Sequence, residues 1–319
     1  MTHKESGDHA ILRSDLYGTT PEPTYAGALS FMRRKYTREL DGVDLVVSGV
    51  PLDTATTNRP GARFGPRAIR AASTIMAWER PYGMPFDPFE RLAVVDYGDC
   101  HFDFGRPEEV PEAIEAHAAA IISQGPGLLS LGGDHFVALP LLRAHAQEHG
   151  APLSLLHFDA HSDTWDDEQG RIDHGTMFWH AVEEGLVDPD HSVQIGLRTR
   201  NADTLGFHVL DGPWVQDNGI DAVIDAARAV LGGRPVYLTF DIDCLDPAYA
   251  PGTGTPVCGG LSTYQALSIL RGLQGINLLG GDVVEVAPAY DVGEITALAA
   301  AHIAMEIICI YASREDFSR

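Results

Sequence analysis

The chain has 319 residues, of which 45% are hydrophobic, and its 22 Lys and Arg against 45 Asp and Glu give a formal net charge of −23. This length and composition are typical of a globular protein with a sizeable core, and the strong negative charge argues against nucleic acid or an anionic membrane as a partner. We also expect a cytoplasmic protein, because no apolar signal-peptide core is visible and no apolar run approaches the roughly 20 residues of a membrane span. The four cysteines form no CxxC pair, which is typical of reduced thiols.

In chain order, a polar N-terminal arm at residues 1–40 precedes one expected α/β domain at residues 41–319. Short β-prone runs recur at residues 45–50, 92–95, 128–131, 153–158, 193–195, 236–240 and 278–284. Amphipathic stretches with helical spacing lie at residues 112–123, 138–148, 219–231, 263–273 and 294–312. Apolar strands that alternate with helices predict a single three-layer domain, in which helices flank both faces of a mainly parallel sheet.

Acidic and imidazole side chains occur at every second residue after two of these runs. Asp159, His161 and Asp163 follow one run, and Asp241 and Asp243 follow another. In extended backbone, side chains two residues apart point in the same direction. The carboxylates of each set should therefore converge, and such a concentration of negative charge requires cations to neutralise it.

Two further polar residues also follow apolar runs. His135 comes after residues 128–131, and Glu285 comes after residues 278–284. Ligands of an open α/β sheet bind at the carboxyl ends of its strands. We therefore expect four strand ends to direct polar groups into one crevice.

The expected metal ligands are His135, Asp159, His161, Asp163, Asp241 and Asp243. Four carboxylates and two neutral imidazoles carry a charge of −4, which two divalent cations cancel. An oxygen-rich set with imidazoles favours Mn²⁺, with Co²⁺, Ni²⁺ or Fe²⁺ as alternatives, and lacks the thiolates of a structural zinc site. Two such ions at ~3.5–4 Å can lower the pKa of a shared water towards neutrality, so the set predicts metal-assisted hydrolysis without a Ser or Cys nucleophile.

Each piece has a simpler explanation when it is taken alone. An Asp-x-His-x-Asp triplet is usually a polar loop, and His135 could be a buried histidine with satisfied hydrogen bonds. The pair Asp241 and Asp243 could cap the next helix, and Cys244 is more simply a small buried residue than a ligand. Their joint occurrence after separate apolar strands nevertheless favours a metal site.

Longer motifs extend this pattern over the chain from about residue 25 to the C-terminus. They are Gly61-Ala62-Arg63-Phe64-Gly65-Pro66-Arg67, Gly132-Gly133-Asp134-His135, Asp159-Ala160-His161-Ser162-Asp163, Phe240-Asp241-Ile242-Asp243-Cys244-Leu245-Asp246-Pro247, Pro251-Gly252-Thr253-Gly254-Thr255-Pro256 and Glu285-Val286-Ala287-Pro288. The chain thereby resembles the ureohydrolases, the family of agmatinases, arginases and guanidino-acid hydrolases. The resemblance implies the arginase/deacetylase-like α/β fold, a homo-trimer or homo-hexamer, and two Mn²⁺ ions per subunit.

The resemblance also implies how the ligands are divided and which residues act. One ion would be held by His135, Asp159, Asp163 and Asp241, and the other by Asp159, His161, Asp241 and Asp243. Catalytic roles are expected for Asp163, for His174 as a proton shuttle and for Glu285 as the guanidinium anchor, with Thr253 orienting that glutamate. A metal-bridging hydroxide would attack the guanidine and give urea and an amine.

The loop after Asp163 is expected to determine which substrate binds. Trp165 stands where arginases use an asparagine to grip the α-carboxylate, and the loop around it is acidic. These features, and the resemblance of the Trp165 position and of Asp173-His174-Gly175-Thr176-Met177-Phe178 to bacterial agmatinases, favour agmatine, cleaved to putrescine and urea for polyamine biosynthesis. Arg171 supports the alternative of a guanidino acid (4-guanidinobutyrate or 3-guanidinopropionate), unless it pairs with a nearby acid or faces water.

Two other classes of function share this fold. A catalytically silent binding protein would be expected to have lost ligands, and all six are present here. The deacetylases use a single zinc ion with fewer carboxylates. Both alternatives are therefore less favoured than a binuclear amidinohydrolase.

Overall fold

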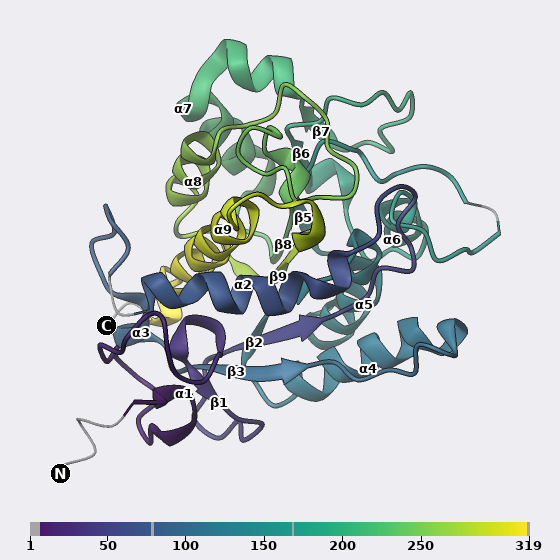
Figure 1. The fold of residues 1–319 in the computed structure, drawn as a ribbon. Helices are drawn as coiled ribbons and strands as arrows, with labels where there is room; N and C mark the ends of the chain where they lie inside the picture. Colours follow the sequence, from purple (N-terminus) through teal and green to yellow (C-terminus); the bar gives the residue numbers. More distant parts are fainter. Residues whose placement is uncertain (1–6, 78–79, 168, 318–319) are drawn as a thin grey trace.

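A parallel sheet forms the centre of the molecule, which we describe from a computed structural model for residues 7–77, 80–167 and 169–317. Within these residues the sheet has nine strands in the order β1-β3-β2-β4-β9-β8-β5-β6-β7, and every pairing is parallel (Figure 1). The strands are β1 (Lys35–Tyr36), β2 (Leu45–Val50), β3 (Val94–Asp99), β4 (Gly127–Gly132), β5 (Ser154–Phe158), β6 (Val193–Ile195), β7 (His208–Leu210), β8 (Val236–Asp241) and β9 (Leu278–Val284).

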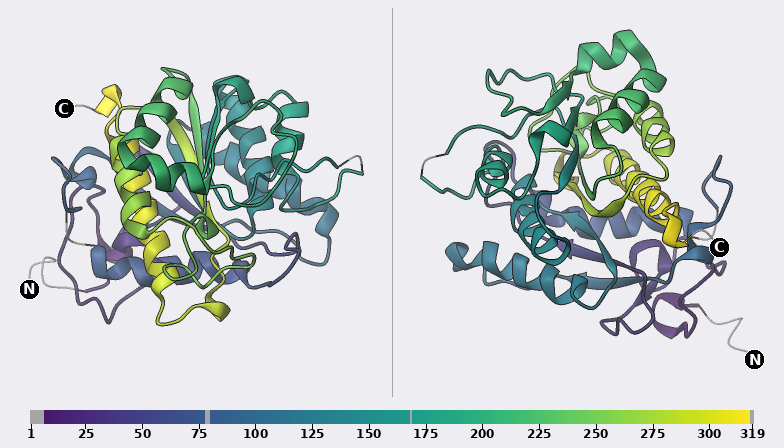
Figure 2. Two further views of the ribbon diagram at one scale, coloured as in Figure 1. Left: turned by 90° about the horizontal axis from the view of Figure 1, so that it is seen from above. Right: turned by 180° about the vertical axis from the view of Figure 1, so that it is seen from behind.

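Helices cover both faces of the sheet (Figure 2). They are α1 (His9–Leu12), α2 (Gly65–Ser73), α3 (Pro88–Arg91), α4 (Val110–Ile122), α5 (Ala138–His149), α6 (Met177–Glu183), α7 (Gly212–Leu231), α8 (Thr263–Gly272) and α9 (Ile295–Ala312). Helices α7, α8, α9 and α2 pack side by side in that order on one face, and α4, α5 and α6 pack on the other. This arrangement confirms the predicted three-layer α/β class.

The four central strands determine where the site lies. Strands β4, β9, β8 and β5 are direct neighbours, and in their register Val284 pairs with Asp241 while Phe240 pairs with Phe158. The next residues, Asp159 and Glu285, therefore leave the sheet beside Asp241. Because all strands are parallel, their carboxyl ends meet at a single edge. The prediction that four strand ends converge on one crevice is confirmed.

Most predicted elements agree with the structure, and the exceptions are short. The runs at 45–50, 193–195 and 278–284 are β2, β6 and β9 as predicted. The strand predicted at 92–95 corresponds to β3, which begins two residues later and ends four residues later than predicted. The helix predicted to begin at Gly219 begins at Gly212, with Gly219 at a kink where φ is 82°. Helices α2 and α6 and the short strands β1 and β7 were not predicted, because elements this short carry little periodic signal.

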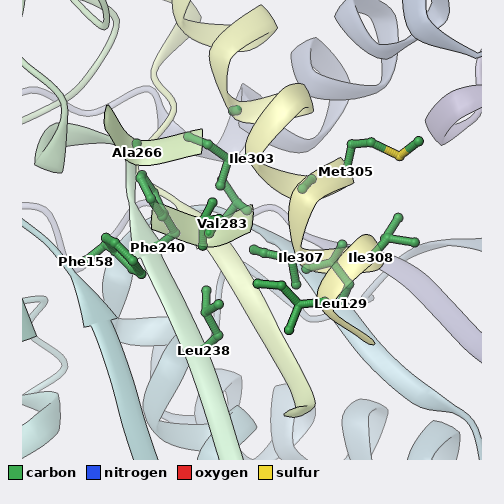
Figure 3. Close-up of a cluster of buried hydrophobic side chains, with 14 of the residues drawn as sticks. Leu129, Phe158, Leu238, Phe240, Ala266, Val283, Ile303, Met305, Ile307 and Ile308 are labelled. Atoms are coloured by element: carbon green, nitrogen blue, oxygen red, sulfur yellow. The ribbon is translucent and has the colours of Figure 1, made fainter. Parts of the chain in front are cut away.

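The longest apolar helix lies inside the fold. Among the described helices, α9 has the length and composition to cross a membrane, with 18 residues of mean hydropathy 1.8, and 83% of it is buried. This corrects the expectation that no apolar run approaches that length. Its residues Ile303 and Ile307 pack with Leu238, Val283 and other sheet residues (Figure 3), as in the core helix of a soluble protein.

Part of the predicted N-terminal arm packs against the domain. Strand β1 extends the sheet beside β3, and the Phe31 N–H donates to Asp96 at 2.6 Å. The guanidinium of Arg34 is fully buried, lies 4.3 Å from the centre of the Phe89 ring and donates to two carbonyls of the arm. The boundary at residue 40 stays a prediction.

Candidate metal centre

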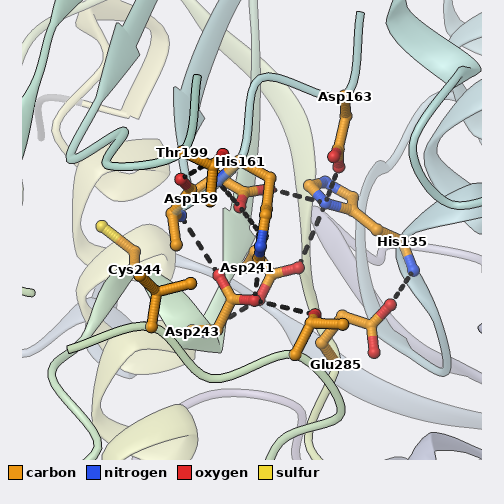
Figure 4. A network of polar contacts seen from close by, with 12 residues as sticks. His135, Asp159, His161, Asp163, Thr199, Asp241, Asp243, Cys244 and Glu285 are labelled. Atoms are coloured by element: carbon orange, nitrogen blue, oxygen red, sulfur yellow. Dashed lines mark hydrogen bonds and ion pairs between the residues drawn. The ribbon is translucent and has the colours of Figure 1, made fainter. Parts of the chain in front are cut away.

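Three carboxylates surround one nitrogen of His135. Its Nδ1 lies 3.0 Å from Asp159 Oδ2, 3.0 Å from Asp163 Oδ2 and 3.2 Å from Asp241 Oδ2 (Figure 4). All four side chains are buried. They come from the loops after β4 and β5 and from the last residue of β8, as the parallel sheet requires.

The other ring nitrogen of His135 forms a hydrogen bond on the side away from the carboxylates. Its Nε2 lies 2.8 Å from Thr239 Oγ1, and that hydroxyl donates to Asp282 Oδ1 at 2.6 Å. Because the hydroxyl proton goes to Asp282, Thr239 accepts from His135, which places the imidazole proton on Nε2. Nδ1 then carries a lone pair towards the three carboxylates, which is the form of histidine that binds a metal.

A second cluster shares Asp159 with the first. His161 Nδ1 lies 3.3 Å from Asp159 Oδ1 and 3.2 Å from Asp243 Oδ2. Asp159 thus gives one oxygen to each cluster, as a bridging carboxylate would. Each of the two carboxylates also accepts a loop N–H on its Oδ1, Asp159 from His161 at 2.6 Å and Asp241 from Asp243 at 2.8 Å.

The crowded acids disturb each other's protonation. Burial raises the pKa of Asp241 well above its ordinary value, and repulsion from Asp243 and Asp159 raises it further. The pKa values of Asp163 and Asp243 are also raised by burial and then by the charge of Asp159. Burial acts in the same direction on Asp159, but the close approach of His135, His157 and His161 holds its pKa well below the usual range.

These residues fit divalent cations. The fully buried Nδ1 of His135 has three carboxylate oxygens around it and no well-formed hydrogen bond. Imidazole lone pairs and carboxylate oxygens are ligands of Mn²⁺ and similar ions. Cations would also replace the protons that the raised pKa values otherwise demand, so the donor set and its electrostatics agree with the predicted metal site.

His157 lies in this cluster and was not predicted. Its Nε2 is 2.8 Å from Asp159 Oδ2, and its Nδ1 is 3.0 Å from the side-chain amide of Gln194. Both ring nitrogens are therefore occupied, so we assign His157 to orienting Asp159 rather than to binding a metal. Its position two residues before Asp159 in β5 was the available signal, because alternate residues of a strand share a face.

His174 and Glu285 are brought into direct contact, although 111 residues separate them. His174 Nδ1 lies 2.8 Å from Glu285 Oε1, and its Nε2 accepts from the Thr57 N–H at 3.0 Å. His174 is buried, which excludes the reading of a surface-loop residue. Burial lowers its pKa, but the hydrogen bond and charge of Glu285, with Asp163 and Asp134, outweigh this effect and raise the pKa to about 9.

Glu285 keeps one oxygen available. Its Oε1 also accepts from the His135 N–H at 2.9 Å, whereas the buried Oε2 has no hydrogen-bond partner among the described residues. A methyl group built on Gly254 would lie 3.5 Å from Oε2, so Gly254 leaves space beside that oxygen. Thr253 precedes it, with its own buried hydroxyl unpaired in the described part of the chain, and makes a backbone bridge to Val286.

The backbone is strained at two of these positions. Asp163 and Glu285 have φ angles of 52° and 63°, in the left-handed region that non-glycine residues rarely adopt. Each such residue costs on the order of 1 kcal/mol or more and persists only where surrounding structure fixes it. Both side chains point into the cluster shown in Figure 4.

Trp165 and Arg171 lie on the loop beside the centre and differ in position. Trp165 is 47% exposed and lines a cavity next to the cluster, whereas Arg171 does not line it. Arg171 instead donates from its backbone N–H and its Nε to Asp167, at 2.6 and 3.3 Å. The expected alternative, in which Arg171 pairs with a nearby acid, is therefore the one observed.

Comparison with known proteins then decides the family. The model of the family described as arginase matches residues 43–309. The chain belongs to the arginase family. This confirms the resemblance to the ureohydrolases and the predicted fold class.

Several arginase-family members are similar over nearly the whole chain. An agmatinase of Chromobacterium violaceum is 58% identical over 310 residues, which cover 97% of this chain and 96% of that protein. A crystal structure of a hypothetical agmatinase from Burkholderia thailandensis is 61% identical with a TM-score of 0.94 and 96% of both chains covered. The proclavaminate amidino hydrolase of Streptomyces clavuligerus is 38% identical with a TM-score of 0.85, covering 92% of this chain and 99% of that one.

Proposed function

We propose that this protein is an agmatinase that hydrolyses agmatine to putrescine and urea with two Mn²⁺ ions. The observation that carries the proposal is its 58% identity over 97% of the chain to an agmatinase. The six predicted metal ligands, His174 and Glu285 lie together at one edge of the sheet, which gives such an activity the groups that it requires.

The chain's own residues would hold the cations. His135, Asp159, Asp163 and Asp241 would bind one, and Asp159, His161, Asp241 and Asp243 the other, in the division that the family resemblance implies. When bound, the ions supply positive charge that polarises the substrate and lowers the pKa of water towards neutrality. Manganese is favoured because the donors are mainly carboxylate oxygens with two imidazoles.

Glu285 is suited to binding the substrate's guanidinium, and His174 is suited to protonating the amine that leaves. The free Oε2 of Glu285 lies in a buried site, where a carboxylate pairs with a planar cation through charge-assisted hydrogen bonds. His174 is held against the same carboxylate and can carry a proton to the leaving amine, which must be protonated to depart. Asp163, held 3.0 Å from His135 Nδ1, would act through the metal that it helps to bind.

The proposal is tested by measuring urea release from agmatine, 4-guanidinobutyrate, 3-guanidinopropionate and arginine. The metal-free protein is loaded separately with Mn²⁺, Co²⁺ and Ni²⁺, and bound metal is counted by mass spectrometry. We expect two ions per chain and the highest kcat/KM for agmatine with Mn²⁺. A higher kcat/KM for a carboxylate-bearing substrate would instead establish a guanidino-acid hydrolase.

The guanidino-acid alternative depends on Arg171. A basic residue that recognised the carboxylate of 4-guanidinobutyrate would have to face the cavity. Arg171 is paired with Asp167 and does not line that cavity, which favours agmatine.

We also propose a cytoplasmic homo-trimer or homo-hexamer. The exposed side chains of Ile75 (59%) and Tyr82 (93%) line one cavity together with residues of α8 and α9. Exposed apolar side chains gathered in one region are typical of subunit contacts. Light scattering on the purified protein measures the oligomeric state directly.

A further inference from the structure

A cavity of about 170 Å³ opens beside the metal cluster. It is lined by Thr57, His161, Asp163, Trp165, Asp173, His174, Gly175, Asp241 and Thr255. Apart from the expected metal ligands and His174, Asp173 is the one charged side chain in this lining among the residues that the structure describes. In the part of the cavity away from the expected metal ions, Asp173 and the indole of Trp165 therefore determine which ligand groups can bind.

The carboxylate and the indole are held side by side across a glycine. Asp173 Oδ1 accepts from the Gly175 backbone N–H at 2.8 Å, and the backbone N–H of Trp165 donates to the Gly175 carbonyl at 3.0 Å. A methyl group on Gly175 would lie 3.3 Å from Asp173 Oδ1 and 3.4 Å from Trp165 Cδ1. The two groups thus flank the bare Cα of Gly175, where one hydrogen bond holds the carboxylate of Asp173 and the other holds the backbone of Trp165.

Asp173 retains its charge for a ligand. Among the described residues it forms no ion pair, because the guanidinium of Arg171 is engaged by Asp167 and the imidazole of the adjacent His174 by Glu285. The carboxylate of Asp167 also lies 3.5 Å from His180 Nε2. Asp167 therefore interacts with residues of its own loop and with α6, and not with the cavity. The loop therefore presents an unneutralised carboxylate to the cavity.

Asp173 is also placed next to the groups that would act on a guanidinium. His174 follows it directly in sequence and contacts Glu285 at 2.8 Å. Glu285 does not itself line the cavity, but its partner His174 does, so a substrate whose guanidinium meets Glu285 would extend its other end past His174 along the cavity. An extended chain of a few methylenes would then end near Asp173 and Trp165.

We propose that Asp173, with the ring of Trp165, binds the terminal ammonium group of the substrate. A carboxylate gives an ammonium a charge-assisted hydrogen bond, and an indole face gives it a cation–π contact. The same carboxylate repels a substrate that ends in a carboxylate, so it selects between amines and acids. This inference rests on the proposed agmatinase function and identifies the residues that recognise the substrate's tail.

The test compares Asp173→Asn with wild type on two substrates of equal length. Agmatine carries the terminal amine, and n-butylguanidine replaces it with a methyl group. For the Mn²⁺-loaded variant we expect KM for agmatine to rise roughly 10–50-fold, while the constants for butylguanidine stay within about twofold. The amide keeps Oδ1 as an acceptor for the Gly175 N–H, so the loop should hold its shape.

Two further variants separate charge from loop structure. Asp166→Asn removes the same charge from an exposed residue outside the cavity, and we expect unchanged constants for agmatine. Trp165→Leu keeps apolar bulk without the indole, and we expect agmatine to be affected roughly 3–10-fold and butylguanidine less.

Several outcomes would overturn the inference. An unchanged KM for agmatine in Asp173→Asn would show that the carboxylate does not bind the amine. Equal losses for agmatine and butylguanidine would assign Asp173 to loop structure alone. If the wild-type protein prefers agmatine and either of these results is found, the proposed binding site for the ammonium group is wrong but the proposed function stands. A wild-type preference for 4-guanidinobutyrate would contradict the proposed function and the binding site together.

Discussion

Thr239 connects His135 to a carboxylate on the neighbouring strand. Its hydroxyl lies 2.8 Å from His135 Nε2 and donates to Asp282 Oδ1 at 2.6 Å, and all three side chains are buried. Thr239 on β8 and Asp282 on β9 are register partners, so the sheet itself places this chain of hydrogen bonds. The arrangement fixes the orientation and proton position of the histidine that faces the carboxylate cluster.

We therefore predict that Thr239→Val weakens metal binding. Valine fills the same volume but cannot accept the His135 proton, and losing such an orienting partner typically costs 10–100-fold in metal affinity. The affinity of the metal-free protein for Mn²⁺, measured by competition with a chelator, should fall by about that factor. An unchanged affinity would show that the hydroxyl does not orient the ligand.

Tyr237→Phe provides the matched control. The Tyr237 hydroxyl donates to the other oxygen of Asp282 at 2.6 Å, and no contact with His135 involves it. Each variant removes one buried hydrogen bond to Asp282, at a cost of roughly 1–3 kcal/mol of stability. Only Thr239→Val should lower the Mn²⁺ affinity.

His174→Asn should separate catalysis from metal binding. His174 contacts Glu285 and Thr57 but lies outside both carboxylate clusters. Loss of a positioned proton donor typically costs 10²–10⁴-fold in rate. We expect kcat for urea release to fall by about that factor while two bound ions remain, and loss of metal in this variant would reassign His174 to the ligand set.

Gly133→Ala should destabilise the fold. A methyl group at Gly133 would lie 1.8 Å from the Leu52 carbonyl oxygen and 2.5 Å from the Leu52 nitrogen, and neither backbone atom can move freely. We expect the free energy of unfolding to fall by roughly 3 kcal/mol. Gly233→Ala is the control, because a methyl group there meets nothing within 4 Å, and denaturant unfolding should leave its stability nearly unchanged.

His145 should make stability depend on pH. Burial lowers its pKa from an ordinary value of 6.5 to about 4, despite its hydrogen bond to the Leu141 carbonyl. The unfolded chain then binds the additional proton, so stability is fully present above pH 6.5 and is lost as the pH falls towards 4. Linkage gives a loss of about 2 kcal/mol at pH 5 from this residue.

The measurement compares the metal-free wild type with His145→Gln by urea unfolding at pH 7 and pH 5. The variant should lose about 2 kcal/mol less than wild type between the two values. The exposed His101→Gln should behave like wild type. Equal losses in all three proteins would contradict the assignment to His145.

The sequence was informative about the central strands and the metal ligands for the same reason. Buried parallel strands are continuous apolar runs, so the runs at 45–50 and 278–284 matched β2 and β9 to the residue. Polar residues directly after such runs stand out, and the strict alternation of Asp159, His161 and Asp163 indicated convergence. Short peripheral elements such as β7 and α6 lack this contrast, and they were missed.

The sequence by itself thus determined the fold class and the ligand types, because both follow from local patterns of apolar and charged residues. Only the tertiary structure decided the partners. It joined His174 to Glu285, placed Thr239 and Asp282 behind His135, turned Arg171 to Asp167 and left Asp173 facing the cavity. Hydrogen-bond partners far apart in the chain depend on strand order and register, which no local pattern encodes.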